Sequence, residues 1–146
     1  MANQKTTEMD NTINLLTTTT GFVDIAVINA QTELSWIVPN ALILDSLDLS
    51  ATADTARWND KVLPVFSTAG KKSTGRVGLV IEGSSDARRY ILRVIGEPTV
   101  ERIRISSMRD VPNTAPDEFC FQQVELEGKK MQIPDMNKLE TKVFKR

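Results

Sequence analysis

The sequence predicts a mainly β protein made of two small antiparallel β-barrels and closed by one short C-terminal helix. Three observations lead to this fold class. The β-branched residues Thr, Val and Ile make up 38 of the 146 residues, and such side chains suit a pleated, half-buried surface. Short segments alternate in polarity and are separated by turn residues. No helical pattern of about 10 to 15 residues lies between them, which argues against a parallel sheet with crossover helices.

The first elements are predicted from alternation. Residues 1–20 are polar and Thr-rich, so they are expected to form a mobile N-terminal tail. Residues 22–29 and 34–38 each place an apolar side chain at every second position, as a strand does. The second of these strands should end at Pro39, because proline lacks the backbone donor that regular pairing needs.

The middle of the chain gives weaker signals. Residues 41–44 are continuously apolar, and such a short run fits either a single helical turn or the start of a buried strand. Residues 45–57 are acidic and irregular and are interpreted as a connection. A strand is predicted at 62–66, on an edge or at a bulge because it contains Pro64. Turn residues and two lysines at 67–75 mark the approximate boundary between the barrels.

Two hairpins and a helix complete the predicted fold. Residues 77–81 and 90–94 alternate and form the first hairpin, and a further alternating stretch includes Ile103 and Ile105. A loop with two prolines covers 110–117, and residues 120–133 form the second hairpin around a tight turn at 127–129.

The last segment has the period of a helix. Pro134 suits a helix start, and Met136, Leu139 and Val143 fall on one face at i, i+3 and i+7. Residues 21–146 are therefore expected to form one domain, which is long enough to build a core without disulfides.

Composition limits the chemistry open to this chain. It has no His, a single Cys at Cys120, and a net charge of −1. Without His there is no Ser-His-Asp or Cys-His nucleophile system and no His general base near neutral pH. One Cys forms neither an internal disulfide nor a C-x-x-C motif, and phosphate-binding Gly motifs are missing. We therefore predict no catalytic residue, no cofactor, no metal, no membrane span and a cytoplasmic setting.

Two other function classes have some support in the sequence. Residues 1–70 carry a net charge of −5 and residues 71–146 one of +4, so a small-barrel nucleic-acid-binding protein is the alternative hypothesis. The arginines that would contact nucleic acid are Arg88, Arg89, Arg93, Arg102, Arg104 and Arg109. A carboxylate-based enzyme would use the acidic cluster Asp45, Asp48, Asp54 and Asp60, whose spacing matches no calcium loop.

An ordered series of segments resembles CheW-like adaptor domains. Residues 35–45, SWIVPNALILD, and residues 57–66, RWNDKVLPVF, follow the family's order of an apolar strand, a Val-x-Glu-like element and a turn before a Pro-Val strand. Later strand pairs and the final helix extend the resemblance over residues 21–143. The Pro-Asn-Ala stretch at 39–41 and Trp58 look most similar to the PilI and ChpC kind, from type IV pilus (twitching-motility) chemosensory systems.

The resemblance implies both a fold and a function. The implied fold is a pair of SH3-like antiparallel β-barrels that share one core, with no active site. The implied function is that of a non-enzymatic adaptor in chemotaxis or twitching signal transduction. Its implied partners are the regulatory domain of a CheA-type histidine kinase and the cytoplasmic tip of a methyl-accepting chemoreceptor.

The resemblance also places candidate partner-binding residues. Ile43 and Asp45 match the Val and Glu of the Val-x-Glu element, although an apolar residue such as Ile43 is more often part of the core. Trp58 is likewise either a core residue or a contact platform. The family's Arg-Gly pair falls on Asn59 and Asp60, which cannot imitate the five-donor fork of Arg, so receptor binding in the usual mode is not implied there. The candidate residues are Leu42, Ile43, Asp45, Trp58, Asn59 and Asp60.

Overall fold

The computed structural model describes residues 21–145, and the predicted tail at 1–20 lies outside them. The described residues form eleven β-strands and one α-helix. The strands are β1 (Phe22–Ile28), β2 (Trp36–Pro39), β3 (Ile43–Asp48), β4 (Thr55–Trp58), β5 (Lys61–Phe66), β6 (Val77–Ile81), β7 (Tyr90–Val94), β8 (Thr99–Arg104), β9 (Met108–Asp110), β10 (Cys120–Leu126) and β11 (Lys129–Pro134). The helix is α2 (Met136–Phe144), and the 3-10 turns are η1 (Asn40–Leu42), η2 (Gly70–Lys72), η3 (Asp86–Arg88) and η4 (Ile105–Ser107).

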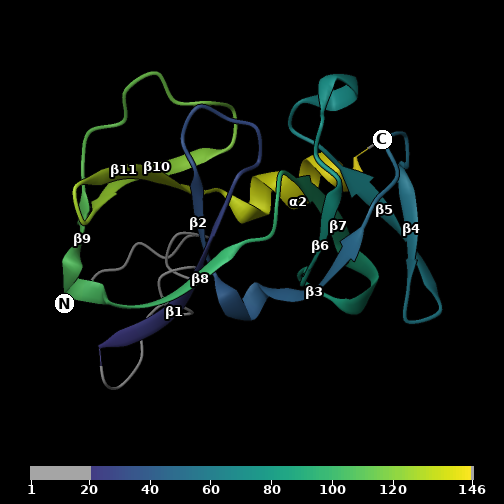
Figure 1. Ribbon diagram of the computed structural model, residues 1–146, viewed down its shortest axis with the longest axis horizontal. Coiled ribbons are helices and arrows are strands. Elements are labelled where there is room, and N and C mark those ends of the chain that lie inside the picture. Colours follow the sequence, from purple (N-terminus) through teal and green to yellow (C-terminus); the bar gives the residue numbers. More distant parts are fainter. Residues whose placement is uncertain (1–20, 146) are drawn as a thin grey trace.

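The strands form two sheets that lie side by side, with α2 reaching across them (Figure 1). The six-stranded sheet has the order β8-β1-β2-β11-β10-β9, and the five-stranded sheet has the order β3-β6-β7-β5-β4. Neighbouring strands are antiparallel except for β2 with β11 and β5 with β7, which are parallel. The expected mainly β fold class, with a closing C-terminal helix, is confirmed.

The six-stranded sheet takes its strands from the start of the described chain and from the part just before α2. The chain leaves this sheet after β2 through η1 and returns to it at β8, so β3 to β7 form the five-stranded sheet as one continuous stretch. Residues 67–75, the approximate boundary that the sequence suggested, connect β5 to β6 within the five-stranded sheet. The chain itself joins the two outer strands of the six-stranded sheet, because β8 continues through η4 directly into β9.

Some elements differ from the sequence-based expectation. Residues 45–57, interpreted as a connection, contain most of β3 and β4. Both are outer strands of their sheet, and in β3 only Ile43 and Leu47 are even half-buried. An outer strand with so little buried surface shows no clear alternation of polarity. The apolar run at 41–44 combines both alternatives, because η1 leads directly into β3.

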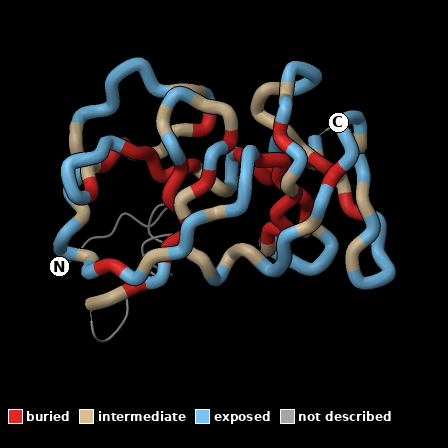
Figure 2. The backbone as a smooth tube through the Cα atoms, in the orientation of Figure 1, coloured by how far each residue is buried: buried red, intermediate tan, exposed pale blue. Residues whose placement is uncertain are grey.

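Three hydrophobic clusters make up the core, and Figure 2 shows buried residues concentrated in both halves of the molecule and between them. One cluster is shared by the two sheets and α2; it includes Ile28, Trp36, Val38, Leu79, Ile81, Tyr90, Leu92, Phe119, Leu139 and Val143. A second cluster fills the six-stranded barrel with residues such as Ile25, Ile103, Val124 and Ile133. A third fills the five-stranded barrel with Leu49, Leu63, Val65, Val80 and Ile91.

Helix α2 begins at a capped end and packs on the shared cluster. Asp135 is the N-cap, and its side chain accepts a hydrogen bond from the backbone N–H of Lys138 at 3.0 Å, which satisfies a donor left free by the first turn. Pro134 therefore ends β11 rather than starting the helix. The predicted apolar face is confirmed, because Leu139 and Val143 are buried.

Candidate partner-binding surface

The two outer strands of the five-stranded sheet meet at a side-chain hydrogen bond. Asp45 lies on β3 and Trp58 ends β4, and the indole Nε1 of Trp58 donates to Oδ2 of Asp45 at 2.9 Å. This bond links the strands at opposite ends of the sheet order, so it closes the barrel with side chains where backbone pairing stops. We call this region, residues 42–46 together with 58–62, the β3–β4 seam.

Trp58 and Ile43 each belong partly to the core. Trp58 is half-buried and packs against the cluster inside the five-stranded barrel. Ile43 is half-buried and packs against the shared cluster. The core interpretation of both residues therefore holds for part of each side chain, and the rest of each remains exposed.

A β-bulge gives the seam its most exposed apolar residue on β3. Ile43 pairs with Ile81 and Asp45 pairs with Val80, which leaves Leu44 as the extra residue. A bulge re-aims the side chain that it leaves unpaired, and Leu44 is 37% exposed. Sequence reasoning missed Leu44, since a bulge breaks the period of two and has no composition signal here.

The turn at the end of the seam has an unusual backbone. Asn59 and Asp60 have φ values of 49° and 63°, and they join β4 to β5 between the paired residues Trp58 and Lys61. Positive φ at both central positions is typical of the type I′ hairpin turn, which favours Asn, Asp and Gly. Both side chains are exposed, and so is Val62 beyond them, at 59%.

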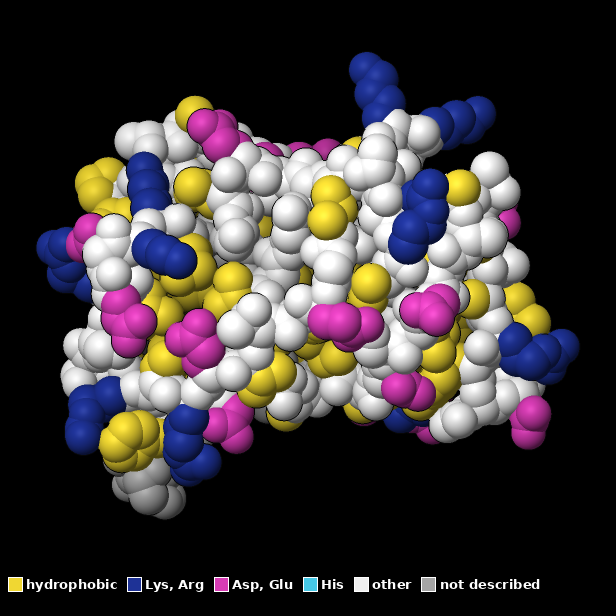
Figure 3. All heavy atoms as spheres, in the orientation of Figure 1, with side chains coloured by type: hydrophobic (Ala, Val, Ile, Leu, Met, Phe, Trp, Pro, Cys, Tyr) yellow, Lys and Arg dark blue, Asp and Glu magenta, His cyan; other side chains and the backbone are white. Residues whose placement is uncertain are grey.

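Charges surround the indole of Trp58. Its hydrogen bond, assisted by the backbone N–H of Ser46, lowers the pKa of Asp45. The guanidinium of Arg89 lies over the indole ring, 5.8 Å from its centre, within the range of a cation–π contact. The Glu82 hydrogen bond raises the pKa of Arg89. On the face shown in Figure 3, acidic and hydrophobic side chains lie together over β3.

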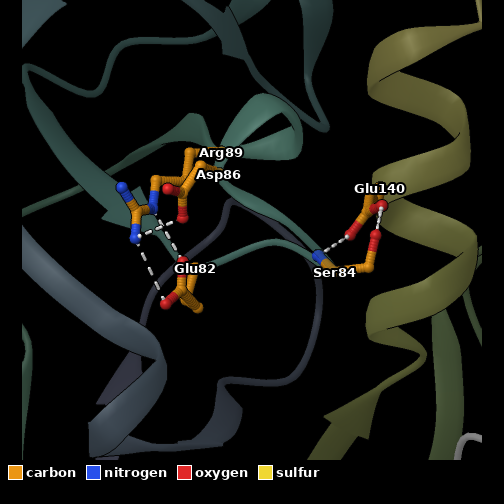
Figure 4. Close-up of polar contacts among 5 residues, drawn as sticks. All are labelled: Glu82, Ser84, Asp86, Arg89 and Glu140. Atoms are coloured by element: carbon orange, nitrogen blue, oxygen red, sulfur yellow. Dashed lines mark hydrogen bonds and ion pairs between the residues drawn. The ribbon is translucent and has the colours of Figure 1, made fainter.

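Arg89 belongs to the loop of residues 82–89 between β6 and β7. Figure 4 shows its guanidinium between Glu82 and Asp86, with nitrogen–oxygen distances of 2.7 Å and 3.0 Å. On the far side of the loop, Ser84 contacts Glu140 of α2. The loop therefore holds Arg89 in place over Trp58 and is itself attached to the helix.

The structure brings the six candidate residues to two adjoining segments. Leu42 ends η1, and its carbonyl accepts a hydrogen bond from the backbone N–H of Glu82 at 2.8 Å. Asp45 and Trp58 touch directly. Ile43 lies two residues before Asp45 on β3, and Asn59 and Asp60 follow Trp58 at the hairpin tip between β4 and β5. Sequence reasoning placed Asp45 and Trp58 in one surface but gave no sign that they are bonded to each other.

The arginines of the nucleic-acid hypothesis do not form one basic face. Most are paired with carboxylates: Arg88 with Glu140, Arg89 with Glu82 and Asp86, Arg102 with Asp24, and Arg109 with Glu125. Arg93 is buried and bonded to carbonyl oxygens, and Arg104 stacks on Phe22. Paired charges that are divided between both sheets give little of the continuous positive surface that a nucleic acid requires.

The described residues contain neither a metal-binding cluster nor a helix suited to span a membrane. Within residues 21–145, no group of three or more His, Cys, Asp or Glu side chains is arranged to hold a metal ion. In the same range, no helix has the length and apolar character needed to cross a bilayer.

Comparison with known proteins identifies the fold. No protein-family model matches the chain, and no curated protein sequence matches it. Among solved structures, it is similar to the crystal structure of the scaffolding protein TtCheW from Thermoanaerobacter tengcongensis, with a TM-score of 0.57 and 17% sequence identity over 77% of this chain and 88% of that chain. The fold is therefore that of two SH3-like barrels, and the cluster common to both sheets is their shared core.

Proposed function

We propose that the protein is a non-enzymatic adaptor that couples a chemoreceptor to a CheA-type histidine kinase, in chemotaxis or in type IV pilus signalling. The observation that carries this proposal is the structural similarity to a scaffolding protein, TtCheW, over 88% of that protein's chain. Because a fold alone does not define a function, the proposal also needs a surface suited to contact.

The β3–β4 seam is the surface that we assign to the kinase. It combines exposed apolar residues, Leu44 and Val62, with the partly buried indole of Trp58 and the charge of Asp45. Arg89 of the neighbouring 82–89 loop adds a cation over the indole. Aromatic and arginine side chains at the centre of a contact, within a polar rim, are typical of protein interfaces. An interface of this kind buries about 800 Å² per partner.

The hairpin tip leads us to propose a specialised adaptor. In the CheW-like family an Arg-Gly pair occupies these positions, whereas here they are Asn59 and Asp60. The change removes a cation and adds an exposed carboxylate, so a receptor tip that pairs with the Arg would meet the opposite charge. We therefore expect the kinase contact to be stronger than any receptor contact through this turn.

Co-elution on size exclusion tests the proposal. The full chain is mixed at tens of micromolar with the regulatory domain of a CheA-type kinase from the same organism, and a complex is expected. Leu44→Glu should abolish the complex, because it places an unpaired charge at the centre of the contact. Leu44 is preferable to Ile43 for this purpose, since a charge at Ile43 would also disturb the shared core.

Val100→Glu is the matched control. Val100 is 56% exposed, and it lies on β8 in the other sheet, so its replacement should leave the complex intact. Absence of a complex with the unmodified chain contradicts the adaptor proposal. A complex that survives Leu44→Glu and is lost with Val100→Glu places the contact on the other barrel.

A further inference from the structure

The five-stranded barrel carries a pocket of about 620 Å³. Pockets of roughly 300–1,000 Å³ are typical of small-molecule sites. Its walls come from the loop before β4, from the end of β5 with the following loop, and from α2. Apolar surface is supplied by Ala51, Ala53, Val65 and Phe66.

A buried cation forms part of the wall. Arg93 of β7 is 5% exposed, and its Nη1 donates to the carbonyl oxygens of Ser50 and Gly75 at 3.0 Å and 2.8 Å. Its Nη2 donates to the carbonyl oxygen of Ala53 at 2.6 Å. None of the ion pairs among residues 21–145 includes Arg93.

Among the described residues, the positive charge of Arg93 therefore has carbonyl oxygens but no carboxylate as partners. A buried cation is ordinarily paired with a carboxylate, because taking an unpaired charge out of water is costly. Burial and the neighbouring charge of Arg76 lower the pKa of Arg93, which is the opposite of what a nearby carboxylate would do. The three carbonyl bonds also use only three of the five N–H donors of a guanidinium.

Two lysines add to the charge of the pocket. Lys71 of η2 and Lys142 of α2 line it, and Asp54 is the one acidic residue among its lining residues. Nζ of Lys142 forms an ion pair with Oε2 of Glu118 at 3.1 Å. Lys71 takes part in none of the ion pairs of the described chain. In Figure 3, Lys and Arg side chains project from the upper right of the molecule, where the loop that carries η2 lies in Figure 1.

We propose that this pocket binds a small organic anion with an apolar body, the anionic group facing Arg93, Lys71 and Lys142. Apolar walls would hold the body of such a ligand, and the cations would select the sign of its charge. Arg93 then has two roles, since it also joins the loops that form the wall. The proposal is independent of the adaptor function, and the pocket residues lie outside the β3–β4 seam.

A pair of fluorescent dyes tests the site in the full chain. The probe is 8-anilinonaphthalene-1-sulfonate, which carries a sulfonate on an apolar body, and the comparison is N-phenyl-1-naphthylamine, the same body without charge. Saturable binding of the sulfonate is expected, with binding of the neutral dye at least about fivefold weaker. Because part of the attraction is between exposed charges, higher salt should weaken binding of the sulfonate alone.

Three variants locate the binding. Lys71→Gln and Lys142→Gln should each weaken sulfonate binding roughly two- to fivefold, as expected for the loss of one exposed charge pair. Lys72→Gln is the matched control, because Lys72 neighbours Lys71 in η2 but does not line the pocket. Equal affinity for the two dyes, no saturable binding, or equal affinity in all three variants would overturn the proposal.

Discussion

Glu140 attaches α2 to the loop that supports the β3–β4 seam, and its removal should destabilise the fold. Its carboxylate accepts hydrogen bonds from the backbone N–H and hydroxyl of Ser84, at 3.0 Å and 2.7 Å, and from Nε of Arg88 at 2.9 Å. Each Ser84 bond contributes about 1 kcal/mol. The Arg88 pair adds about 0.5 kcal/mol, because the Arg88 side chain is 40% exposed. Glu140→Ala should therefore lower the free energy of unfolding by about 2–3 kcal/mol.

The effect should depend on pH in a defined direction. Burial raises the pKa of Glu140, but the hydrogen bonds from Ser84 and Arg88 outweigh it and bring the pKa below 4.5. A carboxyl group whose pKa is lowered by folding stabilises the protein fully above its unfolded pKa, and this stability is lost as the pH falls through the folded value. The difference between the unmodified protein and Glu140→Gln should thus be largest near pH 7 and shrink below about pH 4.5.

Denaturant unfolding at several pH values measures both effects. Glu140→Ala should also lower the Tm by roughly 6–10 °C. Glu118→Gln is the matched control, because Glu118 has a 50% exposed side chain and pairs only with Lys142; its effect should stay within about 0.5 kcal/mol. A Glu140→Gln difference that is the same at pH 7 and at pH 3 would refute the reasoning.

Three further predictions concern the barrel interior, the hairpin and the shared core. Gly78→Ala should lower the free energy of unfolding by about 1–3 kcal/mol, because an added Cβ would lie 2.7 Å from Cγ2 of Ile91; an unchanged denaturation midpoint would contradict this. Combining Asn59→Arg with Asp60→Gly places Gly at a φ of 63°, which suits it, and should strengthen binding to a chemoreceptor tip in a pull-down. Weaker or unchanged binding would count against a receptor contact there. Tyr90→Phe removes a buried hydroxyl that has no hydrogen-bond partner in the described structure, so stability should be unchanged or rise by up to about 1 kcal/mol; a loss of that size would show that the hydroxyl is satisfied.

The sequence predicted best the elements in which buried and exposed positions alternate with the period of a strand or a helix. In β1, Val23 and Ile25 are buried and Asp24 is exposed, so the alternation is visible in the sequence. In α2, Leu139 and Val143 are buried on one face, which produces the helical period. In α2 and at residues 23–25 of β1, one face lies against the core and the other towards solvent. Further along β1 the second face is buried as well, because Ala26 and Ile28 belong to the shared cluster.

The division of the chain between the barrels was not predictable in the same way. The six-stranded sheet depends on a parallel contact in which Gln132 pairs with Trp36, two residues far apart in the sequence. Nothing in the local pattern of either strand records that pairing. The 67–75 segment carries the turn residues of a boundary, yet its composition is equally that of a loop within one barrel.

The sequence grouped the candidate residues in one region, but it did not reveal the contacts between them. Asp45 and Trp58 were placed together by the order of segments, but their hydrogen bond depends on how the barrel closes. The family resemblance implied a turn at Asn59 and Asp60, but the local residue pattern did not indicate it, because an Asn-Asp pair is a weaker hairpin signal than Asn-Gly. Leu44 was missed because the bulge changes which side chain points outward.

The shared core limits how the two barrels can move relative to each other, which bears on the proposed adaptor function. Trp36 from one sheet and Leu79 from the other belong to the same cluster as Leu139 of α2, and all three are 0% exposed. Interiors packed at this density resist continuous deformation, so the two barrels keep a fixed relative orientation. An adaptor of this construction would join its partners by holding two surfaces at a constant separation. Its specificity would then reside in exposed residues such as Leu44 and Asn59, which can change without disturbing the packing between the barrels.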